Sequence, residues 1–486
     1  MNASRIQVWL LLLFINFCFF ANLSAQEYLQ KYYHETDPLV LNQLEKWQDI
    51  KFGLLMHWGP YSQRGIVESW SICSEDEGWC ERKTENYVEY KKDYENLKKT
   101  FNPTKFDPDK WAATAKDAGM KYVIFTTKHH DGFCMFDTKQ TDYKITDKET
   151  PFSANPKANV TKEIFNSFRK NGFMTGAYFS KPDWHNENYW WPYFATPDRN
   201  VNYQIKKYPG RWKKFVEFTH NQIMELMTDY GRVDILWLDG GWVRIKTDEE
   251  VKEQMLSASF AMRPQSQDIN MPELVRKARE KQPGLIVVDR AVEGPYQNYL
   301  TPENQVPGKL LPYPWESCII MGGGWSYAFN AKYKTPREVI HMLVDIVAKG
   351  GNLLLNIAPS AEGIWDEGAY ETLKGVGEWM KINSEAIYNT RPISPYQDGK
   401  VSYTQNRNDK TIYAIYLADK TETEIPAKIF FEGIVPVEKT SISLLGYGEN
   451  LKWKKVENGF EVTISDKLQN HPPNKIALVF KVSVVN

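Results

Sequence analysis

The chain of 486 residues has little cysteine for its length and no excess of charge of either sign. Its five cysteines form no C-x-x-C pair and no H-E-x-x-H pattern occurs, so a structural zinc site is not expected. Lys and Arg number 60 against 61 Asp and Glu, a net charge of -1. A nucleic-acid surface or a polybasic membrane tether requires clustered positive charge, so neither partner is expected.

The cysteines are too few for a disulfide framework in a chain that is long enough to build its own core. Six residues separate Cys73 from Cys80 in a polar segment, and the sequence leaves open whether the two form one bridge in an oxidising compartment or stay reduced. No internal repeat and no low-complexity segment is present.

Long hydrophobic runs are absent except at the N-terminus. There Arg5 precedes an apolar run at 8–20, and small residues follow, which predicts a signal peptide over 1–25 with cleavage just before Gln26. The run is short for a transmembrane helix, so we expect no stable membrane span and a secreted or periplasmic protein. An uncleaved anchor or a lipid on Cys18 is the alternative.

Aromatic residues, in contrast, are abundant. They make up 14% of the chain, with 17 Trp and 27 Tyr. Aromatic rings stack on the apolar faces of sugars, which favours a carbohydrate-binding function. The single observation is weak, and it gains weight only with the positions of the polar residues.

Apolar runs alternate with amphipathic segments over most of the chain, which predicts β-α units around a parallel sheet. The expected strands are 51–58, 121–130, 172–180, 233–240, 284–290 and 351–359, and the clearest expected helices are 108–119, 160–172 and 335–351. We predict a (β/α)8-like barrel over 26–388. A doubly wound sheet is the competing fold, but no G-x-G-x-x-G follows a strand. Short alternating strands over 389–486 predict an all-β sandwich domain.

The predicted strands end in polar residues. In a (β/α) barrel the functional groups gather at these carboxyl ends, so we expect them to share one mouth: His57, His129, His130, Tyr178, Asp239, Arg290 and Asn356. Several tryptophans accompany them, namely Trp58, Trp70, Trp237, Trp242 and Trp325. Together they suit a sugar pocket. A metal is not expected, because adjacent histidines on a strand point to opposite faces and cannot easily reach one ion unless the strand has ended. No second carboxylate cluster completes a metal site.

A glycosidase requires two carboxyl groups, and Asp239 of "VDILWLDGGW" is the natural first. The glycines at 240 and 241 would leave room for a sugar beside it. The second carboxyl group would come from the long segment 289–318, where Glu293, Glu303 and Glu316 are all candidates. The residues alone do not choose among these three.

Five motifs in order carry a family resemblance: "KFGLLMHWGPYS", "KYVIFTTKHHDGF", "DILWLDGGW", "PWESC" with "GGGWSY", and "GGNLLLNIAPSAEG". Over about 40–385 the chain resembles the family 29 α-L-fucosidases, and its C-terminal part is similar to their accessory domain. The resemblance implies a (β/α)8-like barrel and an exo-acting, retaining enzyme without a cofactor. Its substrate would be a fucosylated oligosaccharide or glycoprotein glycan.

The resemblance also implies residue roles. Asp239 would be the nucleophile and Glu303 the acid/base, with Glu316 in reserve and Glu293 third. The implied sugar-binding residues are His57, Glu68, Trp70, His129, His130, Tyr178, Trp237, Arg290 and Trp325. Ser69 separates Glu68 from Trp70, whereas many family members have the acid and the tryptophan adjacent.

Two alternatives to this activity stay open. The same pocket would accept an α-L-galactoside or a related sugar that differs by one hydroxyl, because apolar pockets reject an added hydroxyl only by about 10²-fold. A fucose-binding protein without catalysis is the other. The sandwich would be a structural buttress or a carbohydrate-binding module, and the lack of an obvious exposed aromatic row favours the buttress. The sequence predicts neither the linkage preference nor the oligomeric state.

Overall fold

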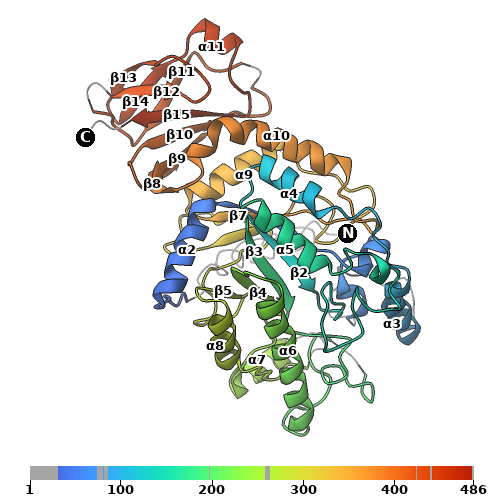
Figure 1. Cartoon of the computed structure of the whole chain (residues 1–486). Helices are drawn as coiled ribbons and strands as arrows, with labels where there is room; N and C mark the ends of the chain where they lie inside the picture. The colour runs from blue at the N-terminus through green and yellow to red at the C-terminus, as the bar shows by residue number, and fades with distance from the viewer. Residues whose placement is uncertain are drawn as a thin grey trace, which may run out of the picture.

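The computed structural model describes residues 31–73, 80, 86–195, 198–257, 263–422, 424–437 and 440–483. It shows a barrel-like α/β part followed by a β-rich part (Figure 1). The expected signal peptide, 1–25, lies outside the described residues. Within the described part of the chain, no helix combines the length and the apolar character needed to cross a membrane.

A parallel sheet of seven strands forms the centre of the first part, in the order β5-β4-β3-β2-β1-β7-β6. Its strands are nearly continuous apolar runs because helices and the sheet's own curvature bury both faces. In chain order they are β1 (Phe52–Met56), β2 (Tyr122–Lys128), β3 (Met174–Ser180), β4 (Ile235–Asp239), β5 (Ile286–Asp289), β6 (Glu316–Ile320) and β7 (Asn352–Asn356). The six expected strands are confirmed, and the barrel-like fold with them.

The sheet differs from a complete eight-stranded barrel at one place, between β5 and β6. An irregular segment, 297–303, fills this gap. It forms an isolated bridge to β5 at Val288 and parallel bridges to Trp315 and Cys318 at β6. We call this segment the seam. It lies where an eighth strand would lie and covers part of the two edges of the curled sheet with these isolated bridges.

Helices surround the sheet, with their apolar faces turned to it (Figure 1). The three expected helices are found as α4, α5 and α9, and α9 begins with a capping box in which Thr335 and Glu338 satisfy each other's backbone N–H groups. The main helices are α2 (Pro38–Ile50), α3 (Tyr87–Glu95), α4 (Pro108–Asp117), α5 (Val160–Lys170), α6 (Pro209–Asp229), α7 (Asp248–Ser257), α8 (Met271–Lys281), α9 (Pro336–Ala348) and α10 (Glu367–Asn383).

The C-terminal part is made of two antiparallel sheets, β12-β15-β10-β9-β8 and β11-β14-β13. Phe431, Phe460 and Phe480 contact one another between them and form the centre of this second core. The elements are β8 (Thr390–Asp398), β9 (Val401–Asn406), β10 (Ile412–Leu417), β11 (Lys428–Glu432), β12 (Ser441–Leu444), β13 (Lys452–Val456), β14 (Gly459–Thr463), α11 (Asp466–Asn470) and β15 (Ala477–Ser483). The expected sandwich is confirmed.

The sandwich packs firmly on the barrel, beside α9 and α10 (Figure 1). Tyr413, Ile415 and Val479 belong to the same hydrophobic core as the barrel helices. The indole N–H of Trp379, on α10, donates a 2.9 Å hydrogen bond to the carbonyl of Ala477. The interface therefore has the buried, hydrogen-bonded character of a single folded unit.

Candidate active site

The carboxyl ends of the strands open into one cavity of about 970 Å³. The expected polar residues that line it are His57, His129, His130, Tyr178, Asp239 and Arg290, together with Glu68, Trp70, Trp237, Glu303 and Trp325. The strands come from distant parts of the chain, but because they run parallel their carboxyl ends bring these side chains together at one end of the barrel. Asn356 does not line the cavity but contacts a residue that does, because its Oδ1 lies 2.9 Å from His57 Nδ1.

Asp239 ends β4, and its carboxylate is surrounded by donors. Tyr178 O–H donates to Oδ2 at 2.6 Å, and the Gly240 N–H donates to Oδ1 at 2.8 Å. Arg290 Nη1 lies 3.1 Å from Oδ1. Burial alone would raise the pKa of Asp239, but the Arg290 charge, His130 and these donors hold it well below its usual range. Asp239 is therefore ionised throughout the physiological pH range.

Arg290 follows β5 and contacts a second carboxylate as well. Its Nη2 forms an ion pair with Glu303 at the end of the seam. The other oxygen of Glu303 accepts a 2.9 Å hydrogen bond from the indole N–H of Trp325. Glu303 is the more open of the two acids, with 43% of its side chain exposed against 14% for Asp239. One buried and one accessible carboxylate thus share a guanidinium.

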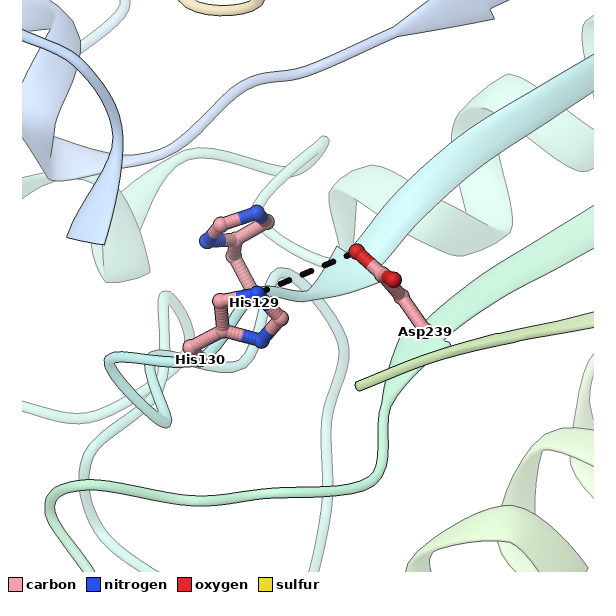
Figure 2. Close-up of side chains that lie close together, drawn as sticks. All are labelled: His129, His130 and Asp239. Atoms are coloured by element: carbon pink, nitrogen blue, oxygen red, sulfur yellow. Dashed lines mark ion pairs between the residues drawn. The ribbon is translucent and has the colours of Figure 1, made fainter. Parts of the chain in front are cut away.

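Three histidines, His57, His129 and His130, form the wall next to Asp239, and Figure 2 shows the last two beside it. Burial lowers the pKa of His57 and of His130 to about 4 and that of His129 well below its usual value. All three rings are therefore neutral at pH 7, and Arg290 supplies the positive charge beside the nucleophile candidate. Neutral imidazoles can both donate to and accept from sugar hydroxyls.

The two adjacent histidines lie beyond the end of β2, so the alternation of side chains along a strand does not apply to them. His130 Nε2 is 3.8 Å from Asp239 Oδ2 (Figure 2), and nitrogen and oxygen atoms of His129, His130 and Asp239 all lie within 4.8 Å of one another. The expectation that the pair points to opposite faces applied to a strand that continues through both residues, and β2 ends at Lys128, before them. The absence of a metal stays a prediction.

Glu68 and Trp70 both reach the cavity despite the extra residue between them. Ser69, the intervening residue, turns away and its hydroxyl contacts His129 Nδ1. Burial raises the pKa of Glu68 to about 8, and among the described residues its Oε1 atom has no hydrogen-bond partner. A protonated carboxyl group with one unpaired oxygen in this pocket is suited to a ligand hydroxyl.

The other two candidate glutamates lie elsewhere. Glu316 begins β6 and is fully buried inside the barrel, where it accepts hydrogen bonds from Tyr122 O–H at 2.7 Å and Trp237 Nε1 at 3.3 Å. It does not line the cavity. Glu293 lines a neighbouring cavity of about 490 Å³. The structure therefore places only Glu303 of the three in the cavity of Asp239.

The glycines after Asp239 act differently from the expectation. Gly240 has a φ of 88°, and a Cβ there would lie 2.3 Å from Pro182 Cδ, so it makes room for protein and permits a left-handed turn. Gly241 lines the cavity, and a Cβ there would lie 3.0 Å from the Arg290 carbonyl oxygen. Of the two glycines only Gly241 lines the cavity, and room for a sugar beside it stays a prediction.

Sequence reasoning missed part of the cavity wall. Arg199, Arg244, Lys246 and Gln254 also line it. None follows a strand directly, because they come from the loops before α6 and α7 and from α7 itself. In this region the sequence pointed only to Trp242, the tryptophan that follows the glycine pair.

An ionised carboxylate beneath an accessible one, in an aromatic pocket at the mouth of a barrel, defines a glycoside hydrolase type of site. Comparison with known proteins gives the family. The Alpha-L-fucosidase family model matches residues 19–385, and the model of the Alpha-L-fucosidase C-terminal domain matches 395–483. The chain belongs to the alpha-L-fucosidase family and is a glycoside hydrolase.

Its relatives are similar over nearly their full length. The plasma alpha-L-fucosidase of Homo sapiens is 28% identical over 466 residues, covering 90% of each chain. The alpha-L-fucosidase isoenzyme 1 of Paenibacillus thiaminolyticus has a TM-score of 0.72 at 27% identity, covering 92% of this chain and all of its own. The Thermotoga maritima alpha-fucosidase, solved with a mechanism-based inhibitor, has a TM-score of 0.69 at 28% identity, covering 93% and 100%.

Proposed function

We propose that the protein is an exo-acting, retaining α-L-fucosidase that releases terminal L-fucose from fucosylated oligosaccharides and glycoprotein glycans. The family assignment sets the reaction class, and one observation supports the assignment of residues. Asp239 and Glu303 contact the same guanidinium of Arg290. This arrangement is compatible with the separation of about 5–5.5 Å between carboxyl groups that a retaining enzyme requires.

In this mechanism Asp239 attacks the anomeric carbon of the fucose and forms a covalent glycosyl-enzyme. The depressed pKa of Asp239 keeps the attacking oxygen ionised. Tyr178 and the Gly240 N–H orient the carboxylate through their hydrogen bonds. Arg290 balances the negative charge of Asp239 before the attack. That charge is lost when the carboxylate becomes an ester, which weakens the ion pair with Arg290.

Glu303 acts at the leaving oxygen. It donates a proton as the glycosidic bond breaks, then accepts a proton from the water that hydrolyses the ester, which restores the original configuration. Its greater exposure allows water and the departing glycan to reach it. Trp325 holds one oxygen of the carboxyl group and fixes its direction.

The remaining wall would bind the sugar itself. His57, His129, His130 and Glu68 offer donors and acceptors for the hydroxyls, and Trp70, Trp237 and Trp325 offer flat apolar faces. The neutral state of the histidines suits uncharged hydroxyls. Deep burial of these groups behind the open Glu303 favours a terminal sugar over an internal one.

We also propose that residues 1–25 are a signal peptide and that the mature protein is secreted or periplasmic, with a catalytic domain over 26–388 and a sandwich over 389–486 that acts as a buttress. None of the cavity-lining residues comes from the described part of 389–486. Whether Cys73 and Cys80 form a bridge stays open.

The experiment is hydrolysis of 4-nitrophenyl α-L-fucoside by the wild type, Glu303→Ala and Glu316→Ala, each with and without azide. Azide attacks the glycosyl-enzyme without help from a base. Rescue of Glu303→Ala alone, with α-fucosyl azide as product, supports both the intermediate and the acid/base. Rescue of Glu316→Ala alone would assign the acid/base role to Glu316. If the wild type does not hydrolyse the substrate, the proposed fucosidase activity is wrong.

A further inference from the structure

The cavity extends well beyond the residues that face Asp239. Its volume of about 970 Å³ is at the upper end of the range of about 300–1,000 Å³ for pockets that hold drug-sized ligands, which exceeds the need of one monosaccharide. The additional wall is formed by Arg199, Trp242, Arg244, Lys246 and Gln254. We call these five residues the basic wall, because three of them are cationic and none is acidic.

Lys246 is the informative member of the basic wall. Its side chain lines the cavity, yet the residue is only 7% exposed. Among the residues that the structure describes, its Nζ atom has no hydrogen bond and no ion pair. Burial and the neighbouring Arg244 lower its pKa to about 8, so it is still mostly a cation at pH 7. Lys246 therefore presents a cation to the cavity, where a ligand of opposite charge can pair with it.

The carboxylates near Lys246 have other partners. Glu250 accepts from Arg244 Nη2 at 2.7 Å and from the Thr247 N–H at 2.9 Å. Asp198 accepts from the Asn200 N–H at 2.8 Å and from the Arg263 N–H. Neither forms an ion pair with Lys246, so the positive charge at the cavity remains.

The wall is also rigid. The Lys246 N–H donates to Ser266 Oγ at 3.0 Å, and the Gln267 N–H donates to the Arg244 carbonyl at 2.8 Å. Arg199 lies over the rings of Trp70 and Trp242, with its Cζ atom 4.8 and 5.2 Å from their centroids. The backbone contacts fix the loop that carries Arg244 and Lys246, so the loop itself loses little entropy when a ligand binds.

From these observations we propose that the basic wall binds an oxyanion carried by the leaving-group glycan, either a sulfate ester or the carboxylate of an acidic sugar. Lys246 and Arg244 would be its partners. This inference rests on the proposed function and narrows its substrate class to acidic fucosylated glycans. Sulfate and carboxylate share the chemistry that an ammonium and a guanidinium recognise.

The test compares three substrates that share one neutral fucosylated oligosaccharide: the parent, its sulfate ester and its sialylated form. The quantity is the ratio of kcat/KM for each acidic substrate to kcat/KM for the parent. We expect a ratio of about ten in the wild type for at least one acidic form, the size of one charge-assisted hydrogen bond. The form with the higher ratio identifies the source of the oxyanion.

Lys246→Gln should lower that ratio to about one, while Lys206→Gln should leave it unaltered. Lys206 is the matched control, since it carries the same charge on a side chain that is 90% exposed and pairs with Asp248 outside the cavity. Arg244→Gln is the second variant and should lower the ratio in the same direction.

Hydrolysis of 4-nitrophenyl α-L-fucoside separates the two failures. If the wild type cleaves it but both acidic ratios are near one, the inference is wrong and the fucosidase stands. An equal loss on neutral and acidic substrates in Lys246→Gln and Arg244→Gln would also overturn it, since the wall would then be structural. No cleavage of any fucoside overturns both proposals.

Discussion

Asp239 and Glu303 are joined through Arg290, which places one Nη atom against each carboxylate. The two acids come from distant parts of the chain, one from the end of β4 and the other from the seam. A single cation can thus respond to both, since charge lost at Asp239 during attack leaves Arg290 more strongly drawn to Glu303. This relationship makes Arg290 the first residue to test.

Arg290→Met should lower kcat/KM by about 10²-fold and shift its acidic limb to higher pH. The Arg290 charge depresses the pKa of Asp239, so its removal raises that pKa and protonates the nucleophile at a higher pH. The pH profile of kcat/KM measures this directly, because it reports the free enzyme. Arg290→Lys, which keeps the charge, should shift the limb less. A rate loss with no shift would make Arg290 a purely geometric support.

Tyr178→Phe should reduce kcat by about tenfold with a smaller change in KM. The variant removes the 2.6 Å hydrogen bond to Asp239 but keeps the ring that stacks on Trp237 at 5.2 Å. Steady-state kinetics on an aryl fucoside measures the effect. Tyr230→Phe is the matched control, because it removes a hydroxyl outside the cavity lining. Equal effects in both variants would contradict the assigned role.

Glu316→Gln should leave hydrolysis largely intact and make the free energy of unfolding less dependent on pH. Burial raises the pKa of Glu316 to about 8. Between the usual value of a glutamate and about 8 the native state holds a proton that the unfolded state has lost. Wild-type stability therefore falls as pH rises through this window, by roughly 1.4 kcal/mol per pH unit from this group.

Urea unfolding across that pH window measures the free energy of unfolding of the wild type and of Glu316→Gln. As pH rises, the variant should gain stability relative to the wild type. Glu68 and Asp131, whose pKa values burial raises to about 8 and about 7, add similar slopes to both proteins and cancel. Glu362→Gln, on an exposed side chain, is the control. A constant difference would show that Glu316 titrates normally.

Gly240→Ala should destabilise the protein by about 2–4 kcal/mol and weaken catalysis, because the new methyl group would overlap Pro182 and the positive φ would be strained. Thermal unfolding and activity measure the two effects. Gly210→Ala, at the start of α6 with no atom within 4 Å of the added Cβ, should be neutral or slightly stabilising. Tolerance of alanine at 240 would refute the steric account.

Much of the architecture could be predicted because apolar runs and helix caps are local signals. Strand β4 is the clearest case, since four apolar residues precede Asp239 and direct it to the mouth of the barrel. Glu303 could not be chosen from pattern alone. Its position depends on bridges between the seam and β6, and pairing of irregular backbone leaves no periodic trace in the sequence.

The basic wall was missed for the same physical reason. Lys246 and Arg244 lie in a loop, and a lysine in a polar loop is usually solvated. Only tertiary packing against residues 266–267 shows that Lys246 is buried. The directions of the His129 and His130 side chains likewise depended on where β2 ends, which is at Lys128 and not beyond the two histidines.

The seam also bears on how such an enzyme can change over generations. The proposed nucleophile, Asp239, is built into a strand that pairs with a neighbour on each side, whereas the proposed proton donor, Glu303, is carried by a short stretch with a few backbone bridges. Insertions or substitutions in that stretch would alter which glycan departs without disturbing the rest of the barrel. New linkage preferences can therefore arise from changes in the seam alone, while the residues that act at the anomeric carbon stay the same.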